Sequence, residues 1–159
     1  MGFDDYASYR DFEAFVAAAE QRLRRALVAS YGPAIGRDAT VDALSWAWEH
    51  WDRLQGMDYP VGYLYRVGQT ASARYLSIGS SEAYPVATSQ SPSDGEPELV
   101  RALGRLSVQQ RSAVVLVHGC AMSQREAADV LGISVSTVRE HLERGMGRLR
   151  GELEVRHGH

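Results

Sequence analysis

The sequence predicts an all-α protein of two small helical domains joined by a flexible linker. Apolar residues recur every three or four positions through both halves of the 159-residue chain, which is the spacing of one helix face. Between the halves lies a stretch rich in Ser, Pro and Gly, whose three prolines prevent a continuous helix. No segment shows a convincing strand pattern. The predicted parts are a domain at 1–76, a linker at 77–97, a domain at 98–154 and a disordered tail at 155–159.

The first domain is predicted to hold a bundle of three helices. The first helix has one apolar face that includes Phe12, Leu23 and Leu27, and Tyr31-Gly32-Pro33 ends it. The second begins near Asp38, a good N-cap. Its apolar stripe contains Trp48 and Trp51, which we expect in the core. After a turn-rich stretch at 52–59, Pro60 opens the third helix. The apolar stripe of the second helix is Val41, Leu44, Trp48 and Trp51.

The second domain is predicted to hold four helices with clear start and stop signals. A short helix covers residues 98–106. Residues 107–110 and 123–126 both have the form of a capping box, with Ser at the cap and Gln or Glu three residues later. The helix after the first box carries a buried apolar run and stops at Gly119. Ser134 caps a last helix that extends to about Leu153.

Residues 123–142 fit a helix-turn-helix. Ala128 supplies the small residue that the helix crossing needs, and Gly132, four positions later, tolerates the positive φ of the turn. The second helix would present the N-terminal end of its exposed face to a DNA major groove. An ordinary helical hairpin is the alternative. The side chains available for that contact are Val135, Ser136, Thr137, Arg139 and Glu140.

The charge is distributed unevenly. The net charge is −3, yet residues 99–159 contain nine Arg against six acidic residues, and residues 77–98 contain four acidic residues and no Arg. Such asymmetry points to a polyanion as the partner of the basic part.

The sequence lacks the residue patterns of a metal centre, a cofactor site or an enzyme. Cys120 is the only cysteine, the five His are scattered, and no Gly-rich phosphate loop is present. We expect no metal, no cofactor and no catalytic residue. The chain contains no apolar run long enough to span a bilayer, and its acidic start is unlike a signal peptide. The expected location is the cytoplasm, with no membrane partner.

These motifs resemble a known family. Residues 106–111, 123–138 and 144–150 resemble region 4 of the extracytoplasmic-function sigma factors of bacterial RNA polymerase. The segments that resemble region 2 of the same family are 12–23, 38–48 and 59–69. The two regions occur in the expected order, with the linker between them.

The resemblance implies a sigma factor that directs promoter-specific initiation without catalysing a covalent step. Its partners would be promoter DNA, core RNA polymerase, bound through the β′ clamp helices and the β flap, and an anti-sigma protein. The implied upstream-element contacts are Ser134, Val135, Ser136, Thr137, Arg139, Glu140 and Arg144. The implied downstream-element contacts are Tyr59, Tyr63, Tyr65, Arg66, Gln69 and Arg74. The implied polymerase contacts are Asp38, Asp42, Ser45, Trp46 and Glu49.

Two other functions remain open at this point. Residues 137–142 also resemble the recognition helix of LuxR-type regulators, so the chain could bind DNA without directing initiation. Alternatively, the acidic first half could hold a protein partner in a module that binds no promoter.

Overall fold

Every regular element that the structure describes is a helix. The computed structural model describes residues 3–78 and 97–157. The all-α prediction is confirmed for these ranges. Residues 79–96 of the predicted linker, and residues 158–159 of the predicted tail, lie outside the described residues. The helices are α1 (Phe3–Tyr31), α2 (Pro33–Glu49), α3 (Trp51–Gln55), α4 (Pro60–Ile78), α5 (Pro97–Gly104), α6 (Val108–Val114), the π-helical turn Val115–Gly119, α7 (Gln124–Leu131) and α8 (Val135–His157).

The first two helices meet at a sharp corner. α1 ends at Tyr31 as predicted, and Gly32 follows with a φ of +89°, which glycine adopts at little cost. Pro33 opens α2, because the first helical residue needs no N–H donor. α2 therefore begins well before Asp38, and the prediction that Asp38 caps this helix is wrong.

α2 buries its small residues instead of its large ones. A Cβ atom on Gly36 would lie 2.5 Å from the Cα atom of Val28 in α1, so the two helices approach closely. Trp48 is 47% exposed, and the prediction that it lies in the core is wrong. Trp51 is buried, as predicted. The buried face of α2 consists of Gly36, Ala39, Thr40, Ala43 and Ala47.

The second half folds around two capping boxes. In both predicted boxes the Ser hydroxyl accepts from the backbone N–H three residues later, and the side chain there accepts from the Ser N–H. The helix after Ser107 finishes in a π-helical turn at Gly119. α8 continues to His157, into the range for which a disordered tail is predicted.

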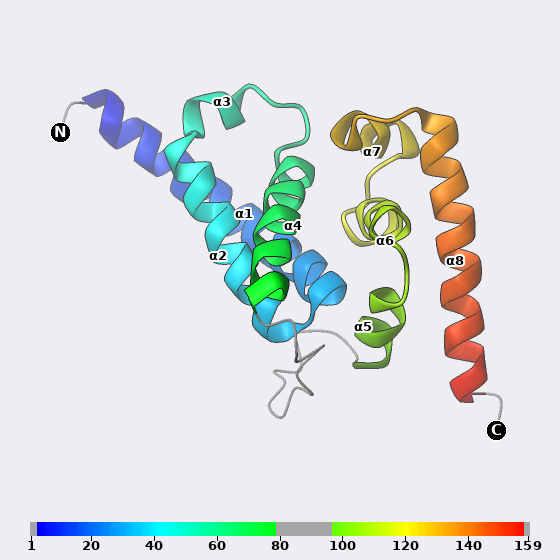
Figure 1. The fold of residues 1–159 in the computed structure, drawn as a ribbon. Helices are drawn as coiled ribbons and strands as arrows, with labels where there is room; N and C mark the ends of the chain where they lie inside the picture. Colours follow the sequence, from blue (N-terminus) through cyan, green and yellow to red (C-terminus); the bar gives the residue numbers. More distant parts are fainter. Residues whose placement is uncertain (1–2, 79–96, 158–159) are drawn as a thin grey trace.

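The two halves are in direct contact. Figure 1 shows α1, α2 and α4 together on one side and α5 to α8 on the other. α1 packs against α5 and the π-helical turn, and α4 packs against α7. The guanidinium of Arg111 in α6 lies 5.2 Å from the ring centre of Tyr31 in α1. One apolar core consequently runs through both halves. Within the described residues, no helix has the length and apolar character that crossing a membrane requires.

Candidate nucleic-acid interface

α7, Gly132 and α8 form a helix-turn-helix. Gly132 has a φ of +69°, the left-handed value predicted for the turn. Its N–H and that of Ile133 both donate to the carbonyl oxygen of Ala128, at 2.8 and 3.1 Å. Ala128 is buried at the crossing, and Val138 in α8 is completely buried. These contacts fix α8 against α7, so the first turn of α8 is held at a defined angle.

The first turn of α8 faces solvent. The Ser134 hydroxyl accepts from the Thr137 N–H at 3.1 Å and lies 2.7 Å from the Thr137 hydroxyl. The cap satisfies the Thr137 N–H, and the exposed Ser134 and Ser136 carry small hydroxyls that suit contact with a phosphate. Arg139 is exposed and forms no ion pair with another described side chain.

The other predicted upstream-element residues lie on or beside this face. Glu140 and Arg144 are exposed and form an ion pair with each other at 2.9 Å. Such an exposed pair is weak and can open when DNA is bound. Ser136 is exposed, and Val135 is half-buried. The structure thus brings all seven predicted residues together on the first turns of α8, and their contact with DNA stays a prediction.

The predicted downstream-element residues divide into three groups. Tyr59 and Tyr63 are half-buried at the start of α4, and Arg74 is exposed farther along it. Arg66 and Gln69 both bond to the second half of the chain. The Arg66 guanidinium donates to the Val130 carbonyl oxygen at 2.7 Å, and the Gln69 amide donates to the Ser112 hydroxyl at 2.5 Å.

Tyr65 is the third group, and its assignment to DNA is wrong. The side chain is completely buried, and its hydroxyl lies 2.8 Å from the Ser30 hydroxyl. A helix places successive residues about 100° apart, so Tyr63 and Tyr65 face different directions. The clustering of aromatic residues near the turn does not distinguish these directions, whereas the packing of α1 against α4 does.

A cavity of about 480 Å³ opens beside the predicted downstream-element residues. The loop between α3 and α4 forms one wall through Gly56, Met57 and Asp58, and α4 contributes Arg66. The remaining lining residues are Tyr59, Tyr63, Asp129 and Val130. The ring centres of Tyr63 and Trp46 lie 5.3 Å apart. Aromatic rings and a cation around such a hollow suit the stacking of an unpaired base.

The predicted polymerase-binding residues lie along α2. Asp38, Ser45 and Glu49 are exposed. Asp42 instead accepts a hydrogen bond from the Tyr75 hydroxyl at 2.6 Å, and this bond raises the pKa of Tyr75. Trp46 stacks on His50 with ring centres 4.2 Å apart. Asp38, Ser45 and Glu49 are therefore accessible to a partner, and Trp46 is accessible in part. Asp42 is already paired with Tyr75.

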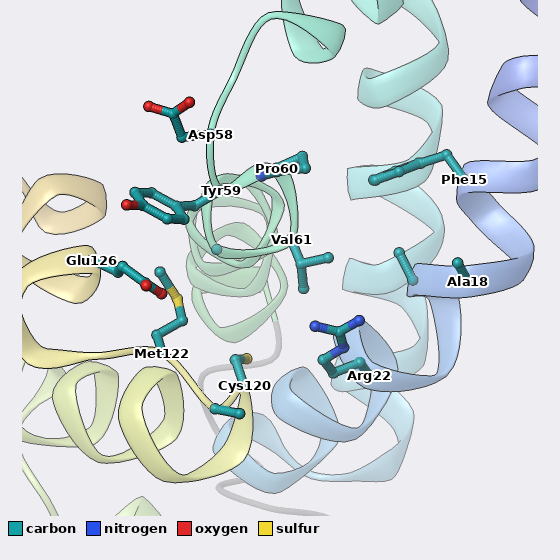
Figure 2. Close-up of a pocket in the computed structure, with 13 residues that line it drawn as sticks. Phe15, Ala18, Arg22, Asp58, Tyr59, Pro60, Val61, Cys120, Met122 and Glu126 are labelled. Atoms are coloured by element: carbon teal, nitrogen blue, oxygen red, sulfur yellow. The ribbon is translucent and has the colours of Figure 1, made fainter.

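A second cavity, of about 350 Å³, lies where α1, α4 and the segment before α7 meet. Figure 2 shows Phe15 and Arg22 on the α1 side, and Cys120, Met122 and Glu126 on the opposite side. Burial raises the pKa of the Cys120 thiol to about 11, which keeps it protonated and unreactive at neutral pH. The described residues contain no group of three or more potential metal ligands.

The sequence reasoning missed two features. Arg111 is buried and donates to the carbonyl oxygens of Leu103, Gly104 and Leu106. Gly62 lies against Met122 and Val130, and a Cβ atom on it would be 3.0 Å from a side-chain atom of each. Neither contact has a signal in the local sequence pattern, because each depends on residues distant along the chain or on the exact end of a helix.

Comparison with known proteins agrees with this geometry. The family described as "Sigma-70, region 4" matches residues 97–149. The RNA polymerase sigma-E factor of Streptomyces coelicolor is 31% identical, over 92% of this chain and 88% of that protein. The RNA polymerase sigma-E factor of Streptomyces antibioticus is 33% identical, over 78% of this chain and 73% of that protein.

Two solved structures share the fold. The Bartonella quintana sigma factor RpoE, solved in complex with the anti-sigma factor NepR, has a TM-score of 0.71 at 21% identity, covering 92% of this chain and 98% of that chain. CnrH, solved in complex with the cytosolic domain of CnrY, has a TM-score of 0.61 at 24% identity, covering 92% and 90%. The family itself is shown by the two Streptomyces relatives, which are 31% and 33% identical over most of this chain. The chain belongs to the extracytoplasmic-function group of the sigma-70 family of RNA polymerase sigma factors.

Proposed function

We propose that this sigma factor binds core RNA polymerase in the cytoplasm and directs it to promoters through two DNA contacts. The observation that carries the proposal is the exposed first turn of α8, held by the Gly132 turn and capped by Ser134. In the second half, this turn reads the upstream element in the major groove. The β flap of the polymerase is the proposed protein partner of this half.

The first half binds the polymerase and the opened strand. α2 docks on the β′ clamp helices through Asp38, Ser45, Trp46 and Glu49, whose acidic groups complement a basic partner surface. The cavity beside Tyr59 and Tyr63 receives an unpaired base of the downstream element. No covalent step is involved.

An anti-sigma protein is a further proposed partner. The support is the shared fold with a sigma factor that was solved together with its anti-sigma factor. A protein that covers α2 or the two DNA contacts would keep the chain from the polymerase.

Run-off transcription with core RNA polymerase on genomic fragments tests the main proposal. The expected result is a promoter-specific transcript that depends on this chain. Binding of upstream DNA with no transcript would instead favour a regulator that does not direct initiation. Binding of neither DNA nor polymerase would favour a protein-interaction module.

A further inference from the structure

Trp46 in α2 contacts an aromatic residue that the proposed function places at the base cavity. Its ring centre lies 5.3 Å from that of Tyr63 in α4, and the two ring planes are inclined at 41°. Tyr63 lines the cavity of about 480 Å³, whereas Trp46 is not among the residues that line it. Trp46 therefore acts on the cavity only through the Tyr63 ring.

The Trp46 ring is itself held by His50. The two rings are nearly parallel, at 15°, and their centres lie 4.2 Å apart. His50 caps the end of α2, where its backbone N–H donates to the Trp46 carbonyl oxygen at 3.0 Å and its ring Nδ1 lies 2.9 Å from the same oxygen. The capped end of α2 consequently fixes one face of the Trp46 ring.

A cation from α3 also contacts the Tyr63 ring. The guanidinium of Arg53 lies over this ring, 5.9 Å from its centre, and a cation in such a place is attracted by the ring. Arg53 is exposed, so its long side chain can move aside when a base arrives. Trp46 is half-buried and packs against the core, so its ring stays in place.

A ring that is held before binding stacks more strongly. A side chain that is ordered in advance loses less conformational freedom when a ligand is placed on it. An aromatic pair contributes an amount that corresponds to about two- to tenfold in an equilibrium constant. The contact between Trp46 and Tyr63 is thus sufficient to change the affinity of the cavity for a stacked base by several-fold.

We infer that Trp46 is a positioning residue for the base cavity: it holds the Tyr63 ring in the orientation in which an unpaired base of the downstream strand stacks on it. This inference rests on the proposed function of the cavity. It gives Trp46 a role in strand binding that is separate from its place on the polymerase-binding face of α2.

A double-mutant cycle tests the inference. Trp46→Leu removes the ring and keeps an apolar side chain, Trp46→Phe keeps a smaller ring, and Tyr63→Leu removes the stacking surface. Trp48→Leu is the matched control, because the Trp48 ring contacts those of Tyr9 and Phe12 instead.

Each variant is first shown to be folded by thermal unfolding. It is then assembled with core polymerase at saturating concentration, so that a change in polymerase affinity does not affect the result. The assembly is titrated with a labelled single strand that carries the downstream element of a promoter found by the run-off assay.

Tyr63→Leu should weaken binding of the strand by about fivefold or more, because a stacking surface is lost. Trp46→Leu should weaken it by about three- to tenfold, Trp46→Phe should recover most of that loss, and Trp48→Leu should change it by less than about twofold. When Tyr63→Leu is already present, adding Trp46→Leu should weaken binding by less than about twofold, because no ring is left to position.

Three outcomes overturn the inference alone, given that Tyr63→Leu weakens binding. The first is equal strand binding by wild type and Trp46→Leu. The second is additive losses in the double variant, which would mean that Trp46 acts on the strand independently of Tyr63. The third is binding by Trp46→Phe that is as weak as that of Trp46→Leu. A Tyr63→Leu chain that assembles with polymerase and binds the strand as wild type does overturns the proposed function of the cavity, and the inference with it.

Discussion

The hydroxyl oxygens of Tyr65 and Ser30 lie 2.8 Å apart, and both side chains are completely buried between α4 and α1. Ser30 also donates to the carbonyl oxygen of Ala26, so Tyr65 is the donor to Ser30. Burial raises the pKa of Tyr65 well above its usual value near 10. The folded chain therefore strongly favours the neutral, protonated form of the Tyr65 side chain.

Tyr65→Phe is expected to lower the free energy of unfolding at pH 7 by about 0.5–1.5 kcal/mol, because one buried hydrogen bond is lost. The pH dependence should change as well. A raised pKa in the folded state means that the contribution of Tyr65 is intact below about pH 10 and falls as pH rises further. Urea unfolding between pH 8 and 11 measures both effects. The difference between wild type and variant should shrink above pH 10, and a constant difference would contradict the assignment.

Gly36→Ala is expected to destabilise the chain by about 1–3 kcal/mol, because the new methyl group would meet the α1 backbone at Val28. Backbone cannot rotate away as a side chain can. The matched control is Gly147→Ala in α8, where a Cβ atom meets nothing within 4 Å. That change should stabilise the chain by up to about 1 kcal/mol through helix propensity. Thermal unfolding of the two variants should therefore shift in opposite directions.

Arg139→Ala is expected to weaken binding of the upstream duplex by about 1–3 kcal/mol. Arg139 is exposed on the first turns of α8, where it can reach a base edge or a phosphate. If it binds a phosphate, the slope of log K against log salt should also fall by about 1. Arg150→Ala, at an exposed position near the other end of α8, is the control. If wild type and Arg139→Ala bind the upstream duplex with equal affinity at every salt concentration, Arg139 does not belong to the DNA-binding site.

Arg111→Lys is expected to cost about 1–3 kcal/mol of stability although the charge is kept. The planar guanidinium reaches three carbonyl oxygens between α5 and α6 and also lies over the Tyr31 ring. An ammonium group cannot keep this fixed arrangement of donors. Chemical denaturation followed by circular dichroism measures the loss. If the lysine variant is as stable as the wild type, the positive charge alone accounts for the contribution of Arg111, and the planar arrangement of its N–H donors is not needed.

Local signals were enough to predict the second half in detail. Ser107, Ser123 and Gly132 act through bonds to residues three or four positions away, and the sequence contains both partners of each bond. The predicted capping boxes and left-handed turn are accordingly found in the structure.

The first half shows what local signals cannot decide. Trp48 and the small residues of α2 compete for the core, and the closeness of Val28 to Gly36 selects the small face. Tyr65 is drawn into the core by Ser30, which lies 35 positions earlier. The contacts of Arg66 and Gln69 with the second half likewise depend on how the halves meet, which no periodicity within one helix contains.

α8 is a single uninterrupted helix of 23 residues. Its first turn carries the proposed DNA-reading residues, and near its other end Glu152 forms an ion pair with Arg105 at 2.8 Å, beside α5. At 1.5 Å of rise per residue, the two ends are separated by roughly 30 Å. Because this one helix packs against α5, α6 and α7 along its length, the orientation of its first turn depends on packing far from the DNA-facing residues as well as on the neighbouring turn.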